Sequence, residues 1–179
     1  LLSRRRIRMY PPDYGNSTFV ETVPLDTVSE AVESLKVLFG DIAYRGIFSA
    51  EFKHDPRDGH FRLLEVNVRP WWLVEFATLC GVNVCELSYQ DALELPTPER
   101  FSFPIGARYM MMPTDFFAYL QRRRTGDVTF RSWWNGIWGA NDAVFRWNDP
   151  LPAFESVLHY PRRAVREIRR TSARLRRNR

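Results

Sequence analysis

The sequence contains few of the residues on which many catalytic sites depend. Its 179 residues include two cysteines, three histidines and only two lysines. The histidines do not cluster, and neither a Ser-His-Asp or Cys-His pairing nor a Gly-rich phosphate loop stands out. Cys80 and Cys85 leave no further cysteine for a zinc set, so we expect two reduced core thiols in a cytoplasmic protein. No stretch approaches the ~20 apolar residues that span a bilayer, and no signal-peptide pattern opens the chain.

The positive net charge comes from one end of the chain. Residues 161–179 contain nine arginines and one glutamate, a local charge of +8. The whole chain has 26 basic and 21 acidic residues. The other 160 residues therefore hold 17 basic and 20 acidic residues, a net charge of about −3. We expect residues 161–179 to form an Arg-rich helix or tail. A solvated tail is one interpretation, and an anionic partner (nucleic acid, acidic protein or membrane surface) is the other.

The segment from Gly46 to Pro70 has the pattern of one β-hairpin. Residues 46–55 and 61–69 are rich in β-branched, aromatic and aliphatic side chains, and the Asp-Pro-Arg-Asp-Gly sequence between them is typical of a turn. Side chains alternate between the two faces of a strand, which gives this hairpin one apolar and one polar face. The apolar face collects Phe48, Ala50, Phe52, Leu64, Val66 and Val68, and the polar face collects Ser49, Glu51, Lys53, Glu65, Asn67 and Arg69.

The alternation also predicts the pairing register of the hairpin. Apolar residues share a face only if the two residue numbers of each cross-strand pair add up to an even value near 116. A value of 116 leaves a five-residue loop between the strands. Glu51 then lies opposite Glu65, and Ser49 lies opposite Asn67. A slip by one residue would bring Glu51 against Leu64 and mix the two faces. Because directly opposed carboxylates repel each other, this pairing indicates a cation between them.

The polar face offers ligands for a metal ion. Two carboxylates and an amide oxygen, from Glu51, Glu65 and Asn67, are hard ligands of the kind that Mg²⁺ accepts, with water and phosphate oxygens completing the octahedron. Arg69 on the same face is placed to hold a carboxylate or phosphate bidentately. Together these residues suggest a metal–phosphate platform. A hairpin with one ordinary solvated face is the alternative interpretation.

The same string resembles the ATP-grasp superfamily. Members carry a glycine, a short strand with an acid, a turn and a strand that reads E-x-N-x-R; here these are Gly46, Glu51 and residues 65–69. Residues 41–46 resemble the family's "lgyrG" segment. Residues 71–84 resemble the helix and "aGVd" turn of its carboxylate–amine ligase-like or carbamoyl-phosphate-synthase-like branch. The likeness extends from residue 5 to about residue 95.

The resemblance implies roles for particular residues. Glu51, Glu65 and Asn67 would bind Mg²⁺ (or Mn²⁺) around ATP, and Arg69 would be catalytic, contacting substrate or phosphate. Arg8, on the basic face of a strand in residues 1–10, would face the phosphates, with a solvated edge charge as the alternative.

Further upstream, the sequence departs from the family. Where better-known ATP-grasp ligases such as biotin carboxylase hold a lysine near the reaction centre, the matching position here is Thr18, which we assign to the nucleotide site. Glu21 matches a family acid. The departure at Thr18 leaves open which residue neutralises the transferred phosphoryl group.

Helical periodicity predicts the elements around the hairpin. Residues 27–40 show an apolar stripe at 3–4 spacing, capped by Asp26 or Thr27, with Glu30 and Glu33 solvated. Further helices are expected over 71–80, 83–94 and 113–124, and strands over 17–23 and 105–112. Trp71 and Trp72 would wall an acceptor pocket or pack in the core. Residues 129–138 read as an aromatic core or subunit contact broken by glycines, and residues 149–152 resemble a "DPxP" turn of this ligase branch.

These features predict an α+β fold, an antiparallel sheet with packed helices resembling the C-terminal catalytic half of an ATP-grasp fold. Residues 1–98 would be the catalytic subdomain, 99–160 an aromatic-rich extension and 161–179 the Arg-rich segment. The N-terminal and lid domains of the family have no counterpart in the chain, so we expect it to be incomplete as an enzyme.

The implied function is Mg-ATP-dependent activation of a small-molecule carboxylate as an acyl phosphate, followed by attack of an amine. Two other classes stay open. One is a non-catalytic remnant that acts as a binding or oligomerisation module, for example in a homodimer. The other is a nucleic-acid-associated protein that works through its Arg-rich tail.

Overall fold

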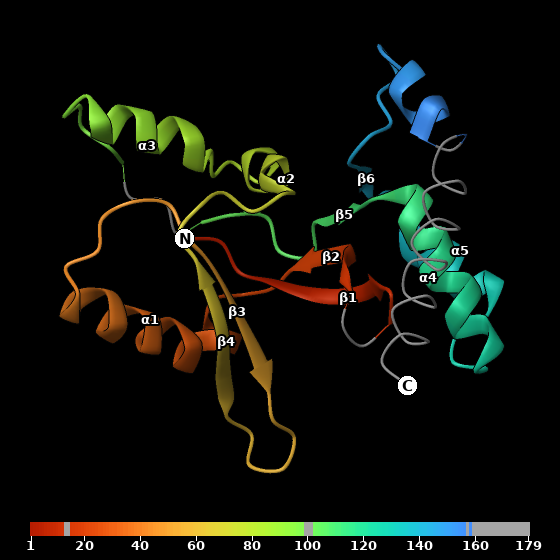
Figure 1. The fold of residues 1–179 in the computed structure, drawn as a ribbon, viewed down its shortest axis with the longest axis horizontal. Helices are drawn as coiled ribbons and strands as arrows, with labels where there is room; N and C mark the ends of the chain where they lie inside the picture. Colours follow the sequence, from red (N-terminus) through yellow and green to blue (C-terminus); the bar gives the residue numbers. More distant parts are fainter. Residues whose placement is uncertain (13–14, 99–101, 157, 159–179) are drawn as a thin grey trace, which may run out of the picture. The chain divides into compact units, whose positions relative to one another are not determined.

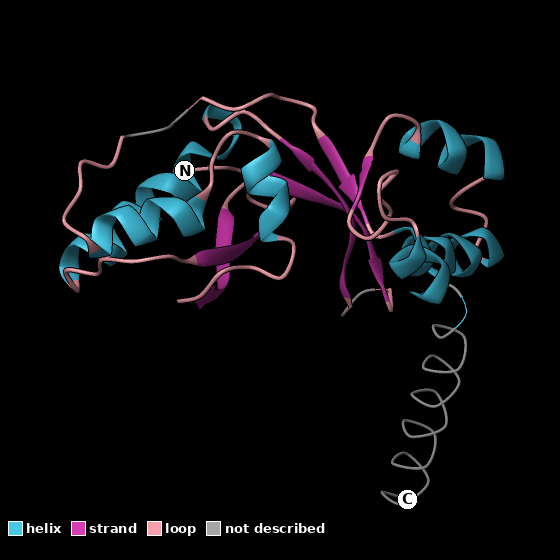
Figure 2. Cartoon of the chain, turned by 90° about the horizontal axis from the view of Figure 1, so that it is seen from above, coloured by secondary structure: helices cyan, strands magenta, loops and turns pink. Residues whose placement is uncertain are grey.

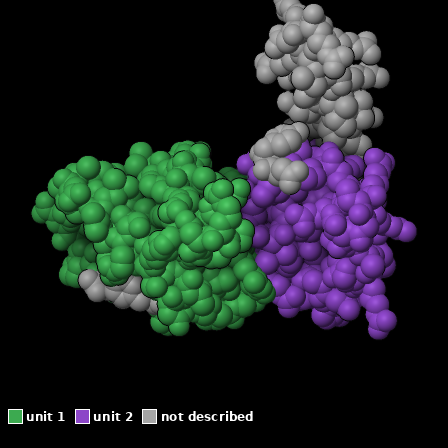
Figure 3. Space-filling view, turned by 90° about the horizontal axis from the view of Figure 1, so that it is seen from below, with its two compact units in different colours: residues 1–5, 21–107 green, residues 6–20, 108–179 purple. Residues whose placement is uncertain are grey.

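A computed structural model describes residues 1–12, 15–98, 102–156 and 158. It divides into two compact units: unit 1 contains residues 1–5 and 21–107, and unit 2 contains residues 6–20 and 108–179 (Figure 3). The Arg-rich segment 161–179 lies outside the described residues, so its predicted helix is not tested. No helix in the described ranges is long and apolar enough to cross a bilayer.

The fold is α+β, as the sequence predicts (Figures 1 and 2). A four-stranded sheet has the order β1-β2-β5-β6, and β3 and β4 form a separate two-stranded antiparallel sheet. β6 pairs with β5 in parallel, so the four-stranded sheet is mixed where the sequence predicts an antiparallel sheet. The strands are β1 (Arg4–Tyr10), β2 (Asn16–Thr22), β3 (Ser49–His54), β4 (Phe61–Asn67), β5 (Arg108–Met110) and β6 (Asn141–Asp142).

In unit 1, helix α1 (Ser29–Asp41) follows a short 3-10 turn, Asp26–Val28, and buries Ala31 and Leu35 as its apolar stripe predicts. Neither predicted cap holds, because the helix begins one turn later and its N-cap, Val28, makes no side-chain bond. Glu30 is not simply solvated either. Its carboxylate accepts hydrogen bonds from the hairpin and thereby ties α1 to the start of β4.

Two further helices complete unit 1. Helix α2 (Val74–Leu79) buries Phe76 and ends before Gly81, whose φ of +83° is a left-handed conformation that favours glycine. Helix α3 (Val84–Ala92) begins at Asn83, whose side chain accepts a hydrogen bond from the Glu86 amide. Trp71 and Trp72 precede α2 rather than belonging to it, so the helix is shorter than predicted.

Unit 2 is built around aromatic side chains. Helix α4 (Met112–Arg124) starts with a proline in its first turn, as predicted, and helix α5 (Phe130–Ile137) packs Trp133 into the core. The core of the unit consists of Phe19, Met110, Tyr119, Trp133 and Ile137. Thr129 and Ser132 form a capping box at the start of α5, which makes residues 130–137 a regular helix despite Gly136.

Candidate metal and nucleotide site

The two glutamates of the hairpin face each other across the strands. Glu51 of β3 pairs with Glu65 of β4, and Ser49 pairs with Asn67, so the predicted register is confirmed at this end of the hairpin. Ser49 is buried, Glu51 and Asn67 are half-buried, and Glu65 is exposed. Two carboxylates at directly opposed positions repel each other unless a cation lies between them.

A β-bulge directly follows this pair. The register shifts between Glu51 and Phe52, and Phe52 pairs with Leu63 instead of the predicted Leu64. Leu64 is thus the extra residue of β4, and 62% of its surface is exposed although the pattern placed it on the apolar face. His54 consequently pairs with Phe61 instead of Arg62, so the connection between the paired residues is one residue shorter than predicted. Bulges bend a strand and are frequent beside active sites, where they re-aim side chains.

Asn67 is oriented by its neighbour on β4. Its amide nitrogen Nδ2 donates a hydrogen bond to Oε1 of Glu65 over 2.6 Å. This bond uses the donor end of the amide, and the Oδ1 oxygen remains as its potential metal ligand. Arg69, two residues further on, is exposed and donates to the carbonyl of Pro70 over 3.4 Å. The carboxylate–amide set therefore offers hard oxygen ligands on one strand face, with a guanidinium next to it in the chain.

Glu51, Glu65 and Asn67 are the candidate protein ligands of a divalent cation. Among the described residues, no group of three or more His, Cys, Asp or Glu side chains is placed to hold a metal ion. Two carboxylates and one amide would leave the other positions of an octahedron to water and phosphate oxygens, which is how Mg²⁺ is usually bound.

Arg4 contacts the segment that follows the hairpin, a contact that the sequence analysis did not predict. Its guanidinium lies 3.6 Å from the ring centroid of Trp71, a cation–π geometry. Trp71 is half-buried, whereas Trp72 is 43% exposed. Trp71 thus packs against β1, and Trp72 is the tryptophan that remains available to a pocket. The alternating basic residues of β1 indicate that one face of the strand is charged, but they do not identify Trp71 as the partner of Arg4.

Arg8 and Thr18 belong to unit 2, and both are buried. Nε and Nη2 of Arg8 each donate to the Asp115 carboxylate over 2.8 Å, and the Thr18 hydroxyl donates to the same group over 2.9 Å. Trp133 Nε1 supplies a fourth hydrogen bond over 2.8 Å. Arg8 is therefore not a solvated edge charge. The assignment of Arg8 and Thr18 to the nucleotide site stays a prediction.

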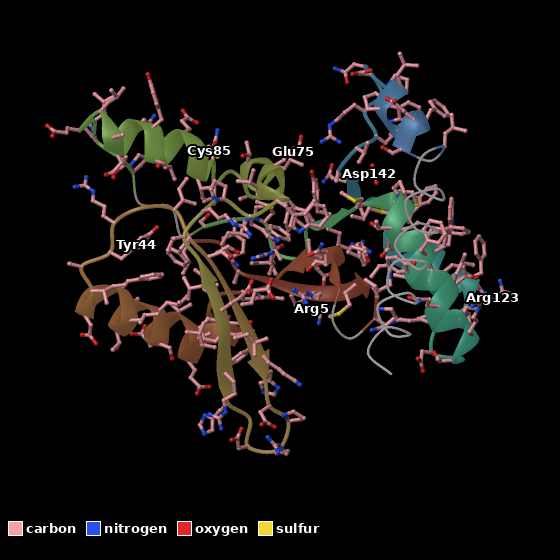
Figure 4. The ribbon with its side chains drawn as sticks, viewed as in Figure 1. Arg5, Tyr44, Glu75, Cys85, Arg123 and Asp142 are labelled. Carbon is pink, nitrogen blue, oxygen red and sulfur yellow. The ribbon has the colours of Figure 1, made fainter. Side chains whose placement is uncertain are left out.

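Two of the remaining charged residues from the sequence, Glu21 and Glu33, form ion pairs within unit 1. Glu21 accepts two hydrogen bonds from the guanidinium of Arg5, at 2.6 and 2.9 Å (Arg5 is labelled in Figure 4). Lys36 pairs with Glu33 over 2.7 Å, with both side chains about two-thirds exposed, and Lys53 is exposed on β3. The two lysines of the chain thus lie on the surface of unit 1.

An apolar cavity of about 660 Å³ lies elsewhere in unit 1. Its walls come mainly from α1 and the segment before β3, including Val32, Phe39, Tyr44 and Phe48. Glu51, Glu65 and Asn67 do not line it. The carboxylate pair and this cavity are therefore separate features of the unit.

Comparison with known proteins gives one informative likeness. The chain is 32% identical over 81 residues to a D-aspartate ligase of Enterococcus faecium (strain Aus0004). The aligned part is 45% of this chain and 18% of that protein, so the chain spans less than a fifth of the length of this relative. No family model and no solved structure matches. The likeness supports a relation to ligases of the broad ATP-grasp type, and nothing finer.

Proposed function

We propose that the chain is the C-terminal catalytic part of an ATP-dependent carboxylate–amine ligase. The observation that carries the proposal is the opposition of Glu51 and Glu65 beside a β-bulge, with the Asn67 amide bonded to Glu65. The partial likeness to a D-aspartate ligase supports the same class of reaction. A pair of like charges at opposed positions destabilises a hairpin, so its presence favours a site built for a cation.

Each residue has a distinct role in this proposal. Glu51, Glu65 and Asn67 would hold Mg²⁺, or Mn²⁺ in its place, and the bound metal would reduce the charge of the ATP phosphates as the reaction proceeds. Arg69 would orient the substrate carboxylate or the transferred phosphoryl group through its planar guanidinium. Arg8 and Thr18 would contribute to the nucleotide site only indirectly, because their side chains are bonded to Asp115.

The reaction consists of two displacements. A carboxylate oxygen of the substrate attacks the γ-phosphorus of ATP, the bond to the β-phosphate oxygen breaks, and ADP leaves with that electron pair. The amine nitrogen of the second substrate then attacks the acyl carbon, inorganic phosphate leaves, and the nitrogen loses a proton. The products are an amide, ADP and phosphate. Arg69 would serve both steps, since each passes through a negatively charged oxygen group next to it.

A non-catalytic remnant is the second candidate, and the surface position of both lysines favours it. The two candidates differ in their response to nucleotide. A ligase predicts that Mg-ATP raises the melting temperature of the protein, whereas ATP with EDTA does not. A remnant predicts no magnesium-dependent difference. The double variant Glu51→Gln/Glu65→Gln should lose the Mg-ATP effect, and the matched variant Glu33→Gln, on the exposed face of α1, should keep it.

Activity can be tested with the amino acid named by the relative. The complete protein would be supplied with Mg-ATP and D-aspartate, in one series with a panel of carboxylates and in another with a panel of amines, because D-aspartate carries both groups. Phosphate release would be compared with that obtained with L-aspartate. Amine-dependent phosphate release with any member of either panel supports a ligase. Phosphate release that does not depend on an amine would contradict the second step.

A further inference from the structure

An exposed aromatic row lies along helix α5 of unit 2. Phe130, Trp134 and Trp138 are four residues apart, a spacing that brings side chains to one face of a helix. Their exposed fractions are 54%, 44% and 70%. The ring centroids of Phe130 and Trp134 are 6.1 Å apart, and those of Trp134 and Trp138 are 6.0 Å apart, so the three rings form a continuous surface.

Side chains directly beside this row on the helix pack into the core. Trp133 and Ile137 are buried, and Trp133 stacks on Tyr119 with ring centroids 4.9 Å apart. Phe130 also contacts Tyr119 and Trp133, with ring centroids 6.2 and 5.8 Å apart, so the aromatic row is the exposed margin of the apolar face that packs into the core. Contiguous exposed apolar patches mark sites of contact with proteins or membranes.

Arginines lie near the aromatic row in the sequence. Residues 116–138 contain Arg122, Arg123, Arg124 and Arg131 but only one acid, Asp127. The first three form the last turn of α4, and Arg123 projects from that helix (Figure 4). A face with tryptophan and phenylalanine beside several arginines has the composition of protein segments that lie in the headgroup region of anionic membranes.

We propose that the aromatic row docks on an anionic membrane surface. The rings of Phe130, Trp134 and Trp138 would enter the boundary between headgroups and acyl chains, and the arginines of α4 and α5 would contact lipid phosphates and carboxylates. This surface is independent of the proposed ligase chemistry, because none of its residues belongs to the Glu51–Glu65 pair.

Two other occupants fit the observations less well. A second copy of the chain would bring the same arginines against each other across a two-fold contact, which like charges disfavour. A single-stranded nucleic acid needs open ring faces for its bases. Phe130 and Trp134 instead lie nearly parallel, at 22°, and stack on each other.

Vesicle binding tests the proposal directly. The full chain would be sedimented with vesicles of phosphatidylcholine alone and of phosphatidylcholine with about 30% phosphatidylserine, at low and high salt. We expect binding to the anionic vesicles, weakened by salt, with a blue shift of tryptophan fluorescence. Trp134→Ser/Trp138→Ser should lower the affinity about tenfold or more. Arg123→Gln/Arg124→Gln should lower it about fivefold per arginine, and only for anionic vesicles.

Matched variants separate this surface from general effects. Tyr89→Ser removes an aromatic side chain of similar exposure, 67%, from α3 of unit 1 and should bind vesicles like the parent. Circular dichroism of each variant checks that the fold is retained. Equal vesicle binding by the parent and the double tryptophan variant would overturn the proposal. The proposal would also be overturned if the parent does not bind vesicles at all but self-associates, or binds a uridine oligonucleotide, and loses that property in the double tryptophan variant.

Discussion

Glu51 and Glu65 lie directly opposite each other in the hairpin, on the strand positions next to its bulge. Side chains at opposed positions of an antiparallel pair are close enough to interact, and two like charges there are destabilising. Considered alone, this pair is less favourable than a Glu–Lys pair at the same positions. A cation-binding role accounts for this arrangement.

The pair gives a prediction in which stability and function change in opposite directions. Without metal, Glu65→Gln should raise the free energy of unfolding by roughly 0.2–1 kcal/mol, because it removes the repulsion and keeps the oxygen that Asn67 bonds. The measurement is urea unfolding in EDTA. The control Glu33→Gln, which weakens an exposed pair with Lys36, should change stability slightly in the other direction. A loss of stability in Glu65→Gln would contradict the repulsion.

The buried carboxylate of Asp115 should dominate the stability of unit 2. It accepts hydrogen bonds from Arg8, Thr18 and Trp133, and it is fully buried. Asp115→Ala would leave the Arg8 guanidinium buried without its counter-ion, at a cost of about 3–5 kcal/mol in chemical unfolding. Asp127→Ala, at an exposed position of the same unit, should cost less than about 1 kcal/mol. Equal costs for the two variants would show that the network contributes little.

The link between α1 and the hairpin should weaken in acid. The Phe61 amide and His60 Nδ1 bind the Glu30 carboxylate over 3.1 and 2.8 Å, and these bonds hold the pKa of Glu30 below its usual range. Because the pKa is lower in the folded state, the stabilisation is present above the ordinary glutamate pKa of about 4.3 and is lost as the pH falls through the folded value.

The matching measurement compares melting temperatures of the parent and Glu30→Gln from pH 7 to pH 3. The parent should melt higher at neutral pH, and the difference should disappear at the acid end. Glu33→Gln should show no comparable pH dependence. A difference that grows on acidification would reverse the predicted sign.

The two cysteines should differ in reactivity. Cys80 is buried, and burial raises the pKa of its thiol, whereas Cys85 at the start of α3 is exposed. Since the thiolate is the reactive species, iodoacetamide at neutral pH should modify Cys85 well before Cys80. Mass spectrometry of peptides over a time course measures both. Faster modification of Cys80 would contradict its burial. The expectation that both thiols lie in the core is wrong for Cys85.

Local alternation predicted the pairing at the metal end of the hairpin but not the bulge beside it. The polar residues Ser49, Glu51, Glu65 and Asn67 leave one register that keeps them together, and the structure has that register. Leu63 and Leu64 are identical in chemistry, so the pattern does not tell which of them faces inward. The extra residue of β4 therefore had no signature in the sequence.

Helix α5 was missed because its local signals conflict. Aromatic residues and Gly136 weigh against a helix, whereas Thr129 and Ser132 form a capping box in which serine replaces the usual glutamate or glutamine. The partner of Arg8 was beyond the reach of spacing arguments, because Asp115 is 107 residues away in the chain. Contacts of this kind depend on how the strands and helices assemble, and no periodic pattern encodes them.

The most direct test of the proposed function is the rate of amine-dependent ADP formation in the complete protein. It would be measured for the parent, for Glu65→Gln and for Glu33→Gln, with Mg²⁺ in excess. The metal assignment predicts that Glu65→Gln loses about a thousandfold in rate, because it removes a group that stabilises charge in the transition state. Glu65→Gln should still fold normally, and Glu33→Gln should keep its activity. Turnover by Glu65→Gln within tenfold of the parent would contradict the assignment of the hairpin as the metal–nucleotide site.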